Sequence, residues 1–163
     1  MIQTNVMNVF EKMENMGHEQ LQFFNDKETG LKGIIAIHNS GDTPSNGVGP
    51  TSGFGGSGSY IYTEASSPVS ANQEFIIESN TLDSSSLDLA INFKWNKRGS
   101  TMGDLYLEYS ANDGISWTTL WSDLGVDVAT NSSDVWNDQS IDLCNLGVNT
   151  GNVKFRFRAK MPA

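Results

Sequence analysis

The chain has 163 residues, a formal net charge of −9 and a charged fraction of 18%. This length fits one domain with a substantial hydrophobic core, and the acidic balance argues against nucleic acid, whose phosphates would be repelled. The one cysteine, Cys144, excludes an internal disulfide and a cysteine-rich zinc site, and its apolar neighbours favour a small buried hydrophobic side chain.

The first forty residues predict a helix followed by a β-hairpin. Apolar side chains recur at helical spacing at Val6, Phe10 and Met13. Gly17 would end this helix. The hairpin would consist of residues 20–24, a turn at 25–30 and a strand at 31–37. That second strand is apolar at nearly every position, so it needs cover on both faces.

Four stretches in this segment carry a family resemblance. They are residues 10–13, 17–20, 26–32 and 34–39. They resemble the amino terminus of the leucine, phenylalanine, valine and glutamate dehydrogenase family, and leucine dehydrogenase most closely. The resemblance implies the start of that family's substrate and oligomerisation domain, and it ends near residue 39. No catalytic lysine motif and no strand-to-helix G-x-G-x-x-G follows, so no catalytic or cofactor-binding residue is transferred.

Residues 41–67 are rich in glycine and serine and form a predicted loop that enters a strand at 60–62. A phosphate-binding loop would need a Gly-Lys-Ser/Thr ending, which this loop lacks.

Alternating apolar and polar residues predict several strands beyond this loop. The clearest is a hairpin: Leu105, Leu107 and Tyr109 alternate with polar neighbours, a turn follows at residues 112–114, and a second strand covers 115–121. The other predicted strands lie at residues 75–77, 87–95, 140–143 and 153–158. The expected core consists of Leu89, Ile91, Phe93, Leu105, Leu107, Trp117 and Phe157.

Five stretches in this larger part also resemble a known family. They are residues 43–50, 58–66, 100–106, 116–121 and 153–158. In this order they resemble a MAM domain of bacterial type, over residues 39–159. The resemblance implies a jelly-roll β-sandwich that serves as an extracellular adhesion and interaction module without catalytic activity. The family's first strand is replaced here by the dehydrogenase-like residues, and its last strands are missing.

Three sets of residues are candidates for chemistry. Residues 110–117 resemble the Asp-box turn of sialidase-type propellers, whose side-chain oxygens cap a hairpin above a tryptophan; this favours a structural role. Calcium could be held by four acidic residues: Asp123, Asp127, Asp134 and Asp138. A sugar platform could be formed by four aromatic residues, although alternating aromatics are more typical of a core: Tyr60, Tyr62, Trp117 and Trp136. His18 and His38 lack metal-ligand spacing, and no G-x-S-x-G elbow is present.

We therefore expect a mainly β protein: a jelly-roll-like antiparallel sandwich at residues 40–163, preceded by the dehydrogenase-like segment at 1–39. The function expected is a non-catalytic adhesion or protein-interaction module, with no catalytic, cofactor or metal residues assigned. The alternatives are a fragment of an amino-acid dehydrogenase and a chimeric fusion without a function as a unit. A protein or a cell-surface glycan is the expected kind of partner.

Two further expectations concern location and the sheet edges. No apolar run approaches transmembrane length, and no signal peptide is present, which indicates the cytoplasm although the MAM resemblance implies an extracellular module. A sandwich that lacks a strand has open edges that favour self-association. We expect residues 31–37 to pair on such an edge.

Overall fold

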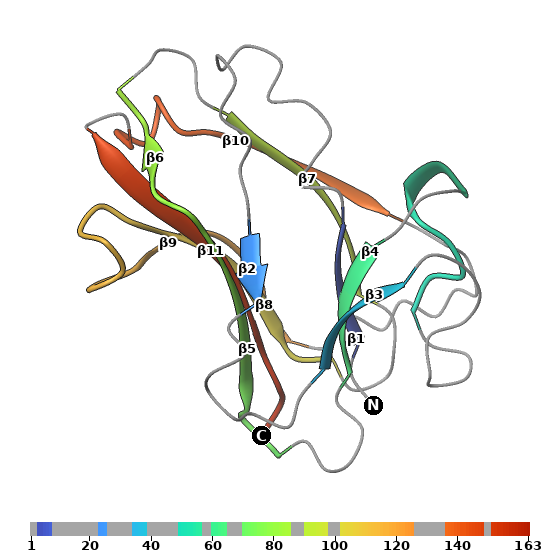
Figure 1. Ribbon diagram of the computed structural model, residues 1–163. Helices are drawn as coiled ribbons and strands as arrows, with labels where there is room; N and C mark the ends of the chain where they lie inside the picture. The colour runs from blue at the N-terminus through green and yellow to red at the C-terminus, as the bar shows by residue number, and fades with distance from the viewer. Residues whose placement is uncertain are drawn as a thin grey trace.

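The computed structural model describes residues 3–7, 23–25, 34–38, 49–56, 60–64, 70–85, 90–97, 102–125, 136–148 and 151–163. Within these ranges the chain forms two antiparallel β-sheets and one 3-10 turn, Phe54–Gly56. Figure 1 shows the sheets as two layers, with β5, β11 and β8 in one and β7, β1 and β4 in the other. The mainly β, antiparallel fold predicted from the alternating segments is confirmed.

The first sheet has the strand order β10-β7-β1-β4-β3. Its strands are β10 (Asn137–Asp142), β7 (Ala90–Lys97), β1 (Gln3–Met7), β4 (Tyr60–Glu64) and β3 (Ile34–His38). The second sheet has the order β2-β5-β11-β8-β9, and β6 pairs with the start of β11. Its strands are β2 (Phe23–Asn25), β5 (Glu74–Ser79), β6 (Leu82–Asp83), β8 (Asp104–Ser110), β9 (Thr118–Asp123) and β11 (Asn152–Lys160).

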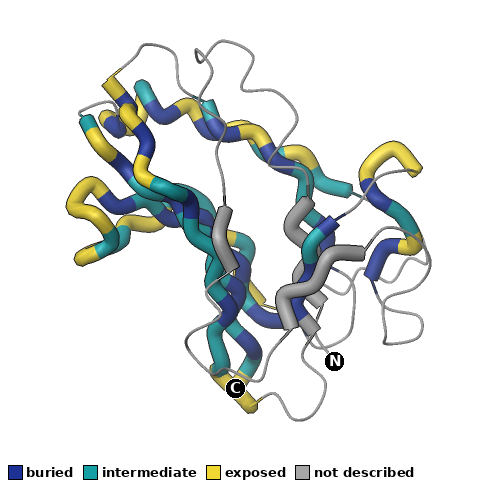
Figure 2. Tube along the Cα trace, viewed as in Figure 1, coloured by how far each residue is buried: buried dark blue, intermediate teal, exposed yellow. Residues whose placement is uncertain are grey.

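The main hydrophobic core lies between the two sheets. Alternate residues of β11 are buried, as Figure 2 shows along this strand, because successive side chains of a strand point to opposite faces. Phe93 of the first sheet contacts both Phe157 and Trp121 of the second, with ring centroids 5.1 Å apart in each pair. Edge-to-face contacts of this kind add about 0.5–1.5 kcal/mol to the burial of apolar area.

Five of the seven predicted core residues belong to this core: Ile91, Phe93, Leu105, Leu107 and Phe157. Leu89 lies outside the described residues. The placement of Trp117 in the core was wrong. Its side chain is half-buried and lies under the guanidinium of Arg156, on the face of β11 that points away from the core. The reason is the hairpin turn, which extends to Trp117, so that β9 starts only at Thr118.

The predicted hairpin is present, with different limits. β8 and β9 pair antiparallel, and a β-bulge interrupts their register between Leu107 and Glu108. Ile115, predicted to begin the second strand, lies in the turn and is 85% exposed. Asp113 and Gly114 have φ angles of 57° and 88°, so the predicted left-handed turn is confirmed at these two positions.

Strands from the dehydrogenase-like segment contribute to both sheets. β1 lies between β7 and β4, β2 pairs with β5, and β3 pairs with β4 at the edge of the first sheet. The expected pairing of residues 31–37 on a sandwich edge is thus confirmed for the part in β3. The predicted hairpin between residues 20–24 and 31–37 was wrong, because β2 and β3, which lie in these stretches, belong to different sheets.

The predicted N-terminal helix falls mainly on residues outside the described ranges and stays a prediction. Val6 lies in β1, where Asn5 and Val6 pair with β4 on one side and β7 on the other, and such pairing satisfies backbone groups on both sides of the strand. Phe10 and Met13 lie outside the described residues.

A buried lysine connects the sheets at the end of β7. The side chain of Lys97 is fully buried, and its Nζ donates a hydrogen bond to the carbonyl of Gly125 at 2.8 Å. The same nitrogen lies 2.6 Å from Asp123 Oδ2 and 3.4 Å from the Asp123 carbonyl. A buried charge is tolerated only where it is paired, and these three oxygens meet that requirement.

Candidate binding surface

Charged and aromatic side chains gather on the face of the second sheet that points away from the core, which we call the outer face. Its central strand, β11, places four cationic residues there in a row: Lys154, Arg156, Arg158 and Lys160. The register sets Arg156 beside Glu108 of β8 and Glu78 of β5. The alternation that buries Val153, Phe155 and Phe157 in the core therefore turns the cations outward.

Glu108 is the centre of this surface. Its carboxylate accepts a hydrogen bond from Arg156 Nε at 2.6 Å. Arg158 donates to it from Nη2 at 2.8 Å and from Nε, which is shared between the two oxygens at 3.1 and 3.3 Å. Burial, which leaves Glu108 5% exposed, would raise the pKa of this carboxyl. The hydrogen bonds and charges of Arg158 and Arg156 together outweigh burial, so the pKa of Glu108 lies below its ordinary value.

Both guanidinium groups also lie over aromatic rings. Arg156 is 4.2 Å from the ring centroid of Trp117, and Arg158 is 4.0 Å from that of Tyr106. The hydrogen bond to Glu108 is the main cause that raises the pKa of Arg158, and Glu74 adds a bond from Arg158 Nη1 at 2.8 Å. These contacts hold the two arginines in fixed positions, with 16% of the Arg156 side chain and 15% of the Arg158 side chain exposed.

Tyr106 is held at its hydroxyl as well. The hydroxyl donates a hydrogen bond to Asp104 Oδ2 at 2.9 Å. Desolvation, followed by this bond to a carboxylate, raises the pKa of Tyr106, so the hydroxyl stays protonated at neutral pH.

The turn at residues 110–117 borders the row at one end. Ser110 Oγ accepts hydrogen bonds from the backbone nitrogens of Gly114 at 2.8 Å and Asn112 at 3.3 Å. Asn112 Oδ1 accepts one from the backbone nitrogen of Ser116 at 2.9 Å. A Cβ atom placed on Gly114 would lie 3.6 Å from the Trp117 ring, so the indole packs beneath the turn. The structural role predicted for this Asp-box-like turn is confirmed.

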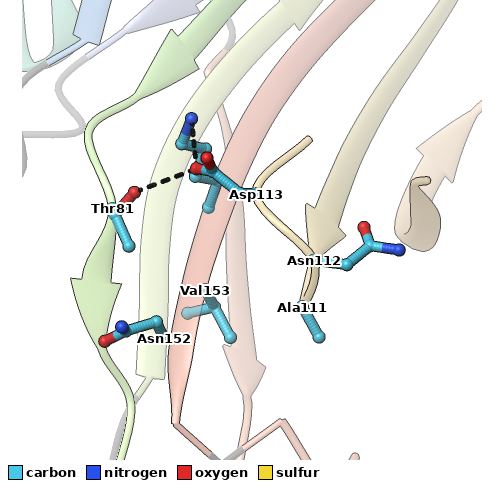
Figure 3. Close-up of a pocket in the computed structure, with 7 residues that line it drawn as sticks. Thr81, Ala111, Asn112, Asp113, Asn152 and Val153 are labelled. Carbon is cyan, nitrogen blue, oxygen red and sulfur yellow. Dashed lines mark hydrogen bonds and ion pairs between the residues drawn. The ribbon is translucent and has the colours of Figure 1, made fainter. Parts of the chain in front are cut away.

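A pocket of about 430 Å³ lies between this turn, β6 and the start of β11. It is lined by Thr81, Ala111, Asn112, Asp113, Asn152, Val153 and Lys154. Figure 3 shows Thr81 and Asp113 pointing toward each other, and Asp113 Oδ1 is 3.4 Å from the Thr81 hydroxyl and 2.7 Å from Lys154 Nζ. The hydrogen bond from Lys154 is the main cause that lowers the pKa of Asp113. Five of these residues have side chains that can form hydrogen bonds to a ligand: Thr81, Asn112, Asp113, Asn152 and Lys154.

The acidic residues considered for calcium do not converge where the structure describes them. Asp123 pairs with Lys97, and Asp138 pairs with Lys94 on the other sheet. Asp127 and Asp134 lie outside the described residues. No group of three or more His, Cys, Asp or Glu side chains that could hold a metal ion occurs within the described ranges.

The aromatic residues considered for a sugar platform lie in two separate places. Tyr60 and Tyr62 are buried and form a small cluster with Trp136, whose ring centroid is 5.7 Å from that of Tyr60. The Tyr60 hydroxyl donates to the carbonyl of Pro50 at 2.7 Å. Trp117 belongs to the second sheet. The interpretation of Tyr60 and Tyr62 as buried packing residues is confirmed, and a common platform does not form.

The remaining candidates are placed as follows. Cys144 is a free cysteine that is half-buried rather than buried as expected. His38 is on β3, and His18 lies outside the described residues. Glu108, Arg156 and Arg158 were not singled out from the sequence, although two arginines spaced two residues apart on a half-buried strand were a usable signal.

The described part of the chain has no helix that is long and apolar enough to span a membrane. The two-sheet fold and the side chains of its outer face together define the class of this protein: a β-sandwich with one charged and aromatic face.

Comparison with known proteins adds one short match. No family model matches the chain. The chain is 51% identical over 39 residues to phenylalanine dehydrogenase from Thermoactinomyces intermedius. The match covers 24% of this chain and only 11% of the enzyme. It supports a dehydrogenase-like segment in this chain, and it spans far too little of the enzyme to carry over the enzyme's activity.

Proposed function

We propose that this chain is a non-catalytic protein-interaction module of adhesion type, and that it binds its partner through the outer face of β5, β11 and β8. The observation that carries the proposal is the anchoring of Arg156 and Arg158 on Glu108 and over Trp117 and Tyr106. The order of MAM-like motifs along the sequence and the antiparallel sandwich support the same function.

The composition of this face fits a protein partner. Tyr, Trp and Arg are the residues that most often dominate the binding energy of protein interfaces. Long side chains normally lose about 0.5–1.5 kcal/mol each in entropy when an interface fixes them. Arg156 and Arg158 are already fixed by Glu108, so a partner would not bear most of this cost.

The arrangement also indicates what the partner offers. Arg156 bonds Glu108 through Nε, while its Nη1 is 4.0 Å from Glu78, beyond hydrogen-bond distance. The Nη groups of Arg156 can therefore bind a carboxylate of the partner in a bidentate manner. An acidic side chain next to an apolar or aromatic one is the matching chemistry.

An adhesion assay tests this surface. Beads coated with the full chain are applied to immobilised extracellular-matrix proteins and, separately, to immobilised glycans. We expect adhesion to a protein layer that falls at least tenfold in Arg156→Ala. The matched control is Lys94→Ala, which removes a cation from the first sheet. Adhesion to glycans alone, adhesion no stronger than that of albumin-coated beads, or an unchanged Arg156→Ala would contradict the proposal.

The absence of catalysis is tested separately. The sequence has neither the lysine motifs of the amino-acid dehydrogenases nor a dinucleotide-binding fingerprint. We expect no reduced cofactor when the full chain is incubated with leucine or phenylalanine and NAD, and no change in tryptophan fluorescence on NAD titration. Saturable NAD binding would overturn this part of the proposal.

The 39-residue match favours a second candidate, a fragment of an amino-acid dehydrogenase joined to another gene segment without a function as a unit. The flanking DNA distinguishes it from the module. An intact dehydrogenase gene next to this sequence would support a fusion, whereas an adjacent gene for a secreted MAM-type protein would support the module.

A further inference from the structure

Within the described residues, the strand order of the two sheets ends in four strands, apart from the two-residue β6 beside β11, and three of the four are protected against pairing with another chain. β9 carries the β-bulge opposite Leu107 and Glu108. β10 carries Asp138 and Asp142, both exposed. β2 has only three residues. Bulges, charges and short length are the devices by which natural sheets prevent edge-to-edge association.

The fourth edge strand, β3, has none of these devices. Its sequence is IIAIH, with no proline, glycine, lysine or acidic residue. It pairs with β4 over five consecutive residues without a shift in register. Within the described part of the chain β4 is its one partner strand, so β3 ends the first sheet. A regular, apolar edge strand presents a row of backbone donors and acceptors for a further strand.

We propose that β3 is a self-association edge, at which a second copy of this chain adds its own β3 antiparallel and extends the first sheet across a twofold axis. The sequence of the strand favours an identical partner. With the axis at Ala36, Ile35 lies opposite Ile37 of the second copy, and all five residues pair. At such a twofold, isologous contact Ile35 pairs with Ile37 twice, once on each side of the axis, and Ala36 pairs with its own copy.

The geometry of the first sheet supports this register. In the antiparallel ladder between β3 and β4, Ile35 pairs with Thr63 and Ile37 pairs with Ile61, while Ala36 pairs with Tyr62. The two isoleucines thus flank Ala36 at the register positions next to Thr63 and Ile61 of β4, and Ile61 packs against the main core. Cross-strand pairs of β-branched residues on one face stabilise an antiparallel ladder. The joined sheet would have ten strands, five from each copy.

This dimer goes beyond the interaction function and does not depend on it. It uses the edge of the first sheet, and the outer face of the second sheet remains open in both copies. Each dimer would then carry two such faces, which raises apparent affinity for a multivalent surface when both can engage at once.

A charge-swap experiment tests the proposal. The mass of the full chain is measured by light scattering and sedimentation over about 1–100 μM, the range in which weak homodimers are detected. We expect dimers in the parent chain. Ala36→Lys and Ala36→Glu each place like charges directly opposite at the axis, so each alone should raise the dissociation constant at least tenfold. An equal mixture of the two variants should form dimers again.

The matched control is Ser140→Lys, which adds a charge to the exposed side of the other edge strand, β10, and should leave the dimer unchanged. Circular dichroism identifies any variant that fails to fold. In that case Ala36→Cys in a Cys144→Ser background gives a second readout, because opposite residues in an antiparallel pair lie within disulfide distance. A covalent dimer on mild oxidation supports the axis. A monomeric parent chain at 100 μM, or dimers of Ala36→Lys as tight as the parent's, would overturn the proposal.

Discussion

Trp117 and Phe157 are both large aromatic residues beside β-strands, yet their surroundings differ. Phe157 is 2% exposed within the core, whereas Trp117 is half-buried beneath a turn and under Arg156. We expect Phe157→Ala to lower the free energy of unfolding by about 3–5 kcal/mol, because it leaves a cavity. Trp117→Ala should cost only about 1–2 kcal/mol, from one cation–π contact and partial burial. Urea denaturation of both variants provides the measurement, and equal losses would contradict this placement of Trp117.

At Glu108, stability is linked to pH. The pKa of this carboxyl is depressed in the folded protein, so its contribution to stability is fully present above the unfolded pKa, near 4.3. The contribution is lost as pH falls through the lower folded value. We expect Glu108→Gln to cost roughly 3 kcal/mol at pH 7, the low end for breaking a buried ion pair, because both arginines keep some contact with water. The difference from the parent chain should shrink in acid.

The control for this variant is Glu78→Gln. The Glu78 side chain is 43% exposed, and its ion pair with Arg156 is 4.0 Å long. An exposed pair contributes roughly 0–1 kcal/mol, so this variant should unfold almost as the parent chain does at every pH. Equal effects of the two substitutions would show that Glu108 is not the centre of the network.

In the turn between β8 and β9, the side chain of Ser110 forms hydrogen bonds to the backbone of the turn. The Ser110 hydroxyl accepts from two backbone nitrogens and donates to Asn112 Oδ1. Ser110→Ala leaves those backbone donors without this acceptor, and we expect it to lower stability by about 1–3 kcal/mol. Ser116→Ala removes an acceptor for the exposed Asn112 amide and should cost less than half as much. Thermal unfolding distinguishes the two, and the opposite order would contradict the role of Ser110.

The elements also differ in how far the sequence could predict them. The alternation at residues 153–158 and the Asn-Asp-Gly turn are local patterns, and both are present in the structure. The place of β1 is not local, because Thr4 pairs with Thr63 on one side and with Lys97 on the other. The outer face depends on the same kind of long-range register. Arg156 meets Glu108 only because β11 and β8 pair across 48 residues of sequence.

At the scale of the whole molecule, residues 1–38 are expected to be part of the fold rather than an appendage. Within the described residues, β4 pairs with β1 and β3, and both come from this segment. Deleting residues 1–38 would therefore leave β4 without either partner strand and open a gap beside β7. We expect the remainder to aggregate or to melt roughly 10 °C or more below the full chain, as a loss of several kcal/mol implies. A monomeric remainder with unchanged melting temperature would show that the segment and the sandwich are independent.

The contact between Trp95 of β7 and Trp121 of β9 has a spectroscopic consequence. These indoles belong to opposite sheets, and their ring centroids lie 5.2 Å apart at an interplanar angle of 58°. Two chromophores at this distance and tilt couple their electronic transitions, and the coupling gives a pair of circular dichroism bands of opposite sign. These bands report on the closure of one layer against the other rather than on the amount of strand. A compact state that keeps its strands and loses its fixed packing would keep its peptide signal and lose this couplet.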